Sequence, residues 1–150
     1  MFRVSSSREI SAPPDEVWAV LCDTEKYAEW IPDTDAVTRT DGAAALGVTY
    51  EEITPILGPW KARSRWRITE FTEGRRMVHR SDDIPLSAGF DVVMEVLPTS
   101  GGAQVTISLE AEERFGPLGW LFARVMTPQV RKANEQSLVN LANRLSPPTR

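Results

Sequence analysis

Few side chains in this 150-residue sequence are suited to acid–base chemistry, since it holds one histidine, His79, and one cysteine, Cys22. Imidazole is the side chain whose ordinary pKa lies nearest to neutrality, so His79 is the first candidate for a general acid or base. No nucleophile elbow, His-Glu-x-x-His motif or Gly-rich phosphate loop accompanies it. Three interpretations of His79 stay open: a catalytic residue, a hydrogen-bonding residue that lines a pocket, and a partly exposed strand residue.

The composition excludes several classes of protein. One cysteine and one histidine cannot form a disulfide framework or a Cys/His zinc site, and we expect neither a metal nor an organic cofactor. A net charge of -4 disfavours nucleic-acid binding. The N-terminus lacks the apolar core of a signal peptide, and Arg124 interrupts the most apolar later run. We therefore expect one domain over residues 1–150, with a frayed tail at 146–150, in a cytoplasmic protein without stable membrane insertion.

The elements that must position any site follow from periodicity and turn residues. We predict a strand over Phe2–Ile10, a helix that begins at Pro13-Pro14, and a short helix over Thr24–Trp30 with Thr24 as its N-cap. Six strands should follow, because period-two patterns alternate with turn residues: Val37–Thr40, Val48–Thr54, Trp60–Thr72, Arg75–Ser81, Phe90–Leu97 and Ala103–Arg114. A long helix from Leu118 to Leu145 should present one broad apolar stripe and a kink near Thr127.

The strand Trp60–Thr72 is the most informative. Trp60, Ala62, Ser64, Trp66 and Ile68 alternate with basic residues, so one face should be covered and the other wet. A two-residue turn at Glu73-Gly74 would pair Thr72 with Arg75 and set Ile68 opposite His79, which would turn His79 inward.

These elements predict an α+β fold, in which a curved antiparallel sheet of about seven strands wraps around the long C-terminal helix, with two short helices after the first strand. Strong curvature leaves space between sheet and helix, and a few polar groups among apolar ones are typical of a ligand pocket. The predicted ligand-binding residues are Tyr50, Ser64, Trp66, His79, Phe90, Met94, Val125, Met126 and Gln129.

Two runs carry a resemblance to a known family: Ile10-Ser11-Ala12-Pro13-Pro14-Asp15-Glu16-Val17-Trp18, and Tyr27-Ala28-Glu29-Trp30-Ile31-Pro32. With Phe115-Gly116-Pro117-Leu118-Gly119, they make the sequence similar to START-like, Bet v 1-like (SRPBCC) helix-grip proteins of the polyketide cyclase/dehydrase group. The resemblance implies a hydrophobic cavity that binds lipids, sterols, hormones or polyketides, and in some relatives cyclises them. It also implies, for aromatases, an inward arginine, whereas the arginines of the strand Trp60–Thr72 alternate outward.

Three functions remain open at this stage. The first is binding of a small hydrophobic, ring-containing or lipid-like ligand, oriented by Ser64 and His79. The second is a cofactor-independent polyketide cyclase or aromatase, in which His79 shuttles a proton and an acyl carrier protein would be the partner. The third is an interaction module that binds a protein partner through either the basic stripe of Lys61, Arg63, Arg65 and Arg67 or the apolar lip of Phe115, Leu118, Trp120, Leu121 and Phe122. In each case we expect a monomer or a homodimer.

Overall fold

The computed structural model describes residues 2–83, 89–111 and 117–145. Its elements, in chain order, are β1 (Phe2–Ile10), α1 (Pro14–Cys22), the 3-10 helix η1 (Thr24–Glu29), β2 (Ala36–Thr40), β3 (Thr49–Leu57), β4 (Trp60–Thr72), β5 (Arg76–Ser81), β6 (Phe90–Thr99), β7 (Gly102–Ala111) and α2 (Pro117–Leu145). The predicted tail 146–150, the end of the last predicted strand and Phe115 of the lip lie outside the described residues.

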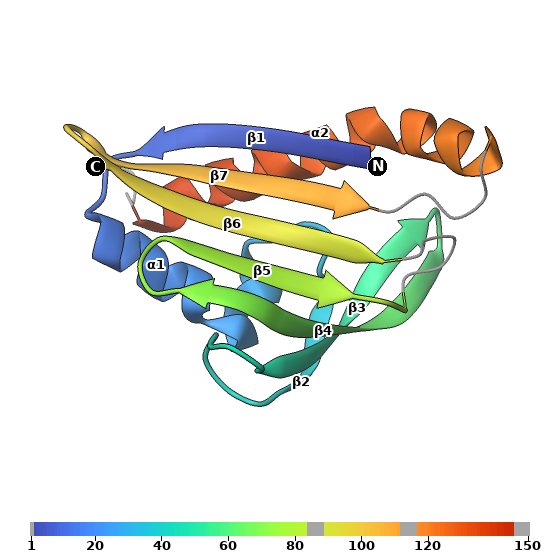
Figure 1. The fold of residues 1–150 in the computed structure, drawn as a ribbon, viewed down its shortest axis with the longest axis horizontal. Helices are drawn as coiled ribbons and strands as arrows, with labels where there is room; N and C mark the ends of the chain where they lie inside the picture. The colour runs from blue at the N-terminus through green and yellow to red at the C-terminus, as the bar shows by residue number, and fades with distance from the viewer. Residues whose placement is uncertain (1, 84–88, 112–116, 146–150) are drawn as a thin grey trace.

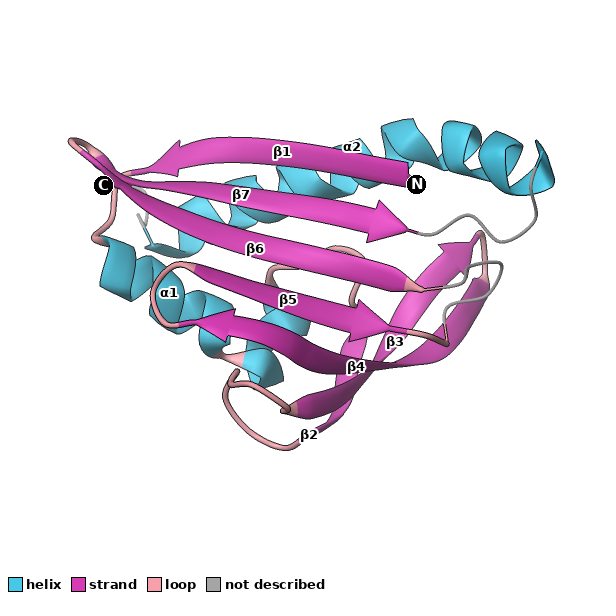
Figure 2. Ribbon diagram, viewed as in Figure 1, coloured by secondary structure: helices cyan, strands magenta, loops and turns pink. Residues whose placement is uncertain are grey.

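The seven strands form one antiparallel sheet in the order β1-β7-β6-β5-β4-β3-β2. Figures 1 and 2 show this sheet twisting strongly from β1 to β2, with α1 and α2 on the same side of it. Every connection between β2 and β7 joins neighbouring strands, as short turns require, and β1 closes the order by pairing with β7. The predicted α+β helix-grip arrangement is confirmed. None of the described helices is both long enough and apolar enough to cross a bilayer.

The hairpin of β4 and β5 has the predicted pairing of Ile68 with His79, but its turn differs from the prediction. Thr72 pairs with Arg76 rather than Arg75, so the turn holds three residues, with Gly74 at φ +73°. An irregularity between Ile68 and Glu70 adds one residue to β4 and cancels the shift, so Ile68 still lies opposite His79. The prediction of a two-residue turn was wrong, and the prediction that His79 turns inward was right.

The first two helices pack against the inner face of the sheet. Pro14 opens α1, and Val17, Trp18 and Leu21 are its buried residues. Thr24 is not the N-cap of η1, a position that Asp23 takes without a side-chain hydrogen bond. Instead, the buried Thr24 hydroxyl donates to the Gly42 carbonyl, 2.7 Å away, which ties η1 to the end of β2.

The prediction of one apolar stripe along α2 was wrong, although the helix does run unbroken through Pro128. Leu138 follows Leu118 by 20 residues, about 5.6 turns, so the two point to nearly opposite sides. Leu138 and Leu141 are in the core, whereas Leu118 and Val125 are exposed. The second half of α2 is also anchored by Asn140, whose amide donates to the Trp30 carbonyl at 3.0 Å.

Trp60 also departs from its prediction, because it is 47% exposed rather than inward. It is the first residue of β4, directly after the turn from β3. The remaining predictions for this strand hold: Ser64, Trp66 and Ile68 are buried, and the basic residues between them are exposed.

Gly102 should be the glycine most sensitive to substitution. Its φ is +145°, and a Cβ there would overlap the carbonyl oxygen of Ile10 at the point where β7 meets the end of β1. Gly42 is the matched control, with φ +130° and nothing within 4 Å of the position that a Cβ would take. We expect Gly42→Ala to lower the free energy of unfolding by about 1 kcal/mol. Gly102→Ala should cost at least about 2 kcal/mol more in urea titrations, and equal losses would contradict this packing.

Candidate functional site

Tyr50 and His79 form a hydrogen-bonded pair on the inner face of the sheet. The Tyr50 hydroxyl lies 2.8 Å from Nδ1 of His79, which is only 1% exposed. This burial rules out the partly exposed strand residue that the sequence left open. Burial also lowers the pKa of His79 from 6.5 to about 4, so the ring is neutral at neutral pH.

The other ring nitrogen of His79, Nε2, is buried without a hydrogen-bond partner. A neutral imidazole has one N–H donor and one acceptor nitrogen. Among the described residues, the Tyr50 hydroxyl has no second partner, which favours the arrangement in which it donates to Nδ1. Nε2 then carries the proton and presents a free donor, the group that could receive a carbonyl oxygen.

Tyr27 of η1 covers this pair, a role that the sequence pattern did not predict. Its ring centroid lies 5.5 Å from that of Tyr50 and 5.9 Å from that of His79, with edge-on geometry. Its hydroxyl donates to the Leu21 carbonyl at 2.5 Å. Burial raises the pKa of both tyrosines well above 10, so both stay protonated. Tyr27, which belongs to the second run that carried the resemblance, therefore forms part of the wall of the candidate site.

A second polar chain runs beside the pair on β3 and β4. The Trp66 indole donates to the Ser64 hydroxyl at 2.9 Å, and Ser64 bonds the Thr54 hydroxyl at 2.7 Å. Ser64 is buried and already has two partners, so its prediction as a ligand-orienting residue is weaker than that of His79. Trp66 is buried in the core, as the strand alternation predicted.

Glu52 ends this chain and is the residue that sequence reasoning missed. It is 6% exposed, and its carboxylate accepts from Thr34 at 3.0 Å and from Thr54 at 3.4 Å. Burial raises its pKa from 4.5 to about 7, against the lowering effect of these two hydroxyl donors. The signal was available, because Glu52 follows Tyr50 by two residues and must share its face.

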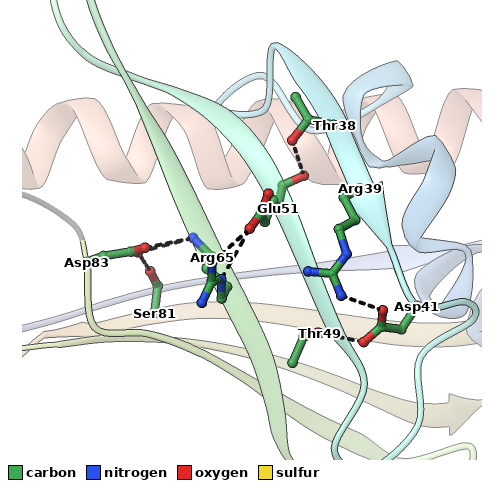
Figure 3. A network of polar contacts seen from close by, with 8 residues as sticks. All are labelled: Thr38, Arg39, Asp41, Thr49, Glu51, Arg65, Ser81 and Asp83. Carbon is green, nitrogen blue, oxygen red and sulfur yellow. Dashed lines mark hydrogen bonds and ion pairs between the residues drawn. The ribbon is translucent and has the colours of Figure 1, made fainter.

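Glu51, the neighbour of Glu52, shows the opposite environment. Its carboxylate accepts from Arg65, whose Nη2 lies 3.1 Å away, on the outer face of the sheet. Figure 3 shows Arg65 between Glu51 and Asp83, with Arg39, Asp41 and Thr49 close by. Cations therefore gather outside, and no ion pair reaches Glu52 among the described residues. The basic stripe is exposed, and at Arg65 the outer carboxylate of Glu51 offsets its charge.

The predicted residues from α2 do not join the buried pair. Val125 is 67% exposed and Gln129 is exposed, because this half of the helix turns their side towards solvent; Met126 is half-buried. On the sheet, Met94 is buried but Phe90 is only half-buried. At the end of the sheet where β6 begins, the half-buried residues on the inner face are Phe2, Phe90, Val92 and Leu109. The inner face is thus incompletely covered where β6 begins.

Cys22 adds no nucleophile to this inventory. It is half-buried and has no disulfide partner, and burial raises the pKa of its thiol to about 11. The reactive thiolate is therefore scarce at neutral pH. Within residues 2–83, 89–111 and 117–145, no group of three His, Cys, Asp or Glu side chains is placed to hold a metal ion.

The chain has the helix-grip fold, because its antiparallel seven-stranded sheet grips a long C-terminal helix. Aromatic and acidic groups lie on the inner face of this sheet. Within this fold class, the chain belongs to the polyketide cyclase/dehydrase and lipid transport family, whose sequence model matches residues 1–146. A curated relative, Toxin Rv0910 of Mycobacterium tuberculosis, is 23% identical over 137 residues, covering 89% of this chain and 93% of that protein.

Solved structures share the fold at low identity. The di-domain ARO/CYC StfQ from the steffimycin biosynthetic pathway is 15% identical, with a TM-score of 0.77 over 97% of this chain and 50% of that one. A START superfamily protein from Mycobacterium smegmatis is 14% identical, with a TM-score of 0.74 over 97% of each chain.

Glu52 and His79 should pull the stability of the protein in opposite directions with pH. A carboxyl whose pKa is raised from 4.5 to about 7 makes the folded state less stable as pH rises through that range. A histidine whose pKa is lowered from 6.5 to about 4 makes it less stable as pH falls through its range. Glu52→Gln removes the first effect, so the unfolding free energy of the variant should rise steadily from pH 4 to 6.5.

Above pH 7 the Glu52→Gln variant should exceed the wild type by about 2 kcal/mol, measured by urea unfolding followed through tryptophan fluorescence. Glu51→Gln is the control, and its change should stay within about 0.5 kcal/mol because that carboxylate lies in an outer-face ion pair. A Glu52→Gln variant that is less stable than the wild type by the same amount at every pH would contradict the raised pKa.

Proposed function

We propose that the protein binds a small hydrophobic, ring-containing or lipid-like molecule between the inner face of the sheet and α2. The observation that carries this proposal is the buried, unpartnered Nε2 of His79 among aromatic rings. A buried donor without a partner costs free energy, which a ligand acceptor would recover. The incompletely covered apolar residues at the start of β6 supply the surface that a hydrophobic molecule would bury.

The chemistry of the polar group follows from the protonation states. His79 and Tyr50 are neutral at neutral pH, so the site offers a hydrogen-bond donor without a positive charge. A ketone, ester or amide oxygen fits such a donor, whereas a carboxylate would find no cation among the described residues that surround His79. The proposed ligand is therefore an uncharged carbonyl compound with an apolar body. The family description, which includes lipid transport, supports the apolar part of this proposal.

A polyketide cyclase or aromatase is the second candidate, and Glu52 favours it. Ring closure of a poly-β-ketone needs a base that takes a proton from the carbon between two carbonyls. The carbanion then attacks another ketone, and the new alkoxide takes up a proton. A carboxyl with a pKa of about 7 could accept and return that proton, and the His79 N–H could stabilise the oxygen. An acyl carrier protein would be the partner in that case, and the protein would act in the cytoplasm.

Ligand binding should show a preference for a carbonyl group that depends on His79. The reporter is Prodan, a fluorescent naphthalene ketone, and the competitors are 2-acetylnaphthalene and 2-ethylnaphthalene, which differ at one oxygen. The wild type should bind the ketone about tenfold more tightly than the hydrocarbon, as one good hydrogen bond allows. His79→Phe should retain both ligands and lose the preference.

The exposed-site variant Leu97→Glu should keep the preference and serves as the control. Native mass spectrometry before titration identifies any molecule that co-purifies in the site. Equal binding of the two competitors by the wild type, or an unchanged preference in His79→Phe, would contradict the proposal. Loss of poly-β-ketone cyclisation in Glu52→Gln, with ketone binding intact, would favour the second candidate.

A further inference from the structure

The first half of α2 presents an apolar surface to solvent. Leu118, Trp120, Leu121 and Val125, here called the α2 patch, are between 52% and 73% exposed. They are four of the seven exposed large hydrophobic side chains in the described part of the chain, and the other three, Leu46, Trp60 and Leu97, are scattered. Clustering of this kind marks an interaction surface, whereas single exposed side chains do not.

Three of the four residues of the α2 patch face away from the core, whereas Trp120, two residues after Leu118, lies on the other side of the helix and is 53% exposed. Leu118, Leu121 and Val125 follow one another at steps of three and four residues, which places them along one side. Leu138 and Leu141, in the second half of the same helix, are buried against the sheet on nearly the opposite side. Burial in the monomer therefore does not explain the apolar character of the patch.

Basic side chains accompany the α2 patch along the same stretch of helix. Arg124, Arg131 and Lys132 are exposed, and no aspartate or glutamate occurs between positions 117 and 134. The Arg124 guanidinium lies 5.3 Å from the ring centroid of Trp120. The chain as a whole carries a net charge of -4, so this positive segment is a local feature.

We propose that the α2 patch docks the protein on the surface of an anionic lipid bilayer. The leucine and valine side chains enter the boundary between headgroups and acyl chains, and the arginine and lysine side chains of the same stretch of helix reach anionic headgroups. Such a helix lies in the plane of the interface and does not span the membrane, as the lengths and polarity of the described helices require.

The charges favour a lipid surface over a second copy of the chain. A symmetric dimer through the α2 patch would bring Arg124, Arg131 and Lys132 of the two copies close together, where like charges repel.

The position of the proposed ligand site relative to the α2 patch gives a reason for docking. Figure 1 shows the first half of α2 at the same end of the sheet as the start of β6, where the inner face is incompletely covered. Docking would bring that end to the bilayer, although the docking itself does not depend on the proposed ligand.

Vesicle co-sedimentation tests the proposal with the full chain. The wild type should bind phosphatidylcholine vesicles that contain phosphatidylglycerol, bind pure phosphatidylcholine far more weakly, and dissociate as salt is raised. The double variant Leu121→Glu, Val125→Glu should lower the partition coefficient by about tenfold or more. Replacing Arg124, Arg131 and Lys132 by glutamine should lower it roughly fivefold for each charge removed.

The matched control is Leu46→Glu with Leu97→Glu, two similarly exposed leucines elsewhere, which should leave vesicle binding unchanged. Circular dichroism and urea unfolding verify that each variant folds. Three outcomes would overturn the proposal: a wild type that ignores anionic vesicles, equal losses in the patch and control variants, or a dimer in analytical ultracentrifugation that Leu121→Glu, Val125→Glu dissociates. Ketone binding should persist in the patch variant, so the two proposals can fail separately.

Discussion

The inner face of the sheet buries polar side chains, and among the described residues no cation pairs with them. Strand alternation sends Lys61, Arg63, Arg65 and Arg67 of β4 to the outer face, and the same alternation sends Ser64 and Trp66 inward. Hydroxyl groups bond Glu52 and His79. Burial shifts the pKa of each group towards its neutral form, to about 7 for Glu52 and about 4 for His79, because an ion in such surroundings would be costly. The proposed ligand chemistry rests on the neutral form of His79.

The polar groups are arranged so that most of them satisfy one another. Tyr27 is held by a main-chain carbonyl, Tyr50 by His79, and Trp66 by Ser64. Among the described residues, Nε2 of His79 shares the lack of a partner with the buried indole nitrogens of Trp18 and Trp30, but of these three it alone belongs to the hydrogen-bonded groups on the sheet itself. A buried donor without a partner is a reason to look for a ligand. Evidence from the site is needed because one fold can host many unrelated functions.

Much of this arrangement could be predicted from the sequence, because strand alternation is a strong and local signal. The order and approximate extent of the strands, the covered side of β4 from Ser64 to Ile68 and the inward side chain of His79 followed from it. The predictions failed where a local rule of side-chain periodicity was extended over many residues of the chain. The turn of the β4–β5 hairpin and the irregularity near Thr69 cancelled each other, which no count along the chain could reveal. In α2, the spacing of the apolar residues predicted one stripe. However, the 20 residues from Leu118 to Leu138 make about 5.6 turns, so the two side chains point to nearly opposite sides. Glu52 was missed because its acidic type suggested solvent, although its position demanded burial.

The central claim is that His79 is a buried, neutral imidazole with its proton on Nε2. It is the only histidine in the sequence, so its side-chain nitrogens give one unambiguous set of signals. Long-range 1H–15N correlation spectra across a pH titration measure both the tautomer and the pKa. We expect a single Nε2–H tautomer at neutral pH and a pKa of about 4, and we expect the Nε2 chemical shift to move when a ketone is added. A pKa near 6.5 with two tautomers in fast exchange would contradict the central claim.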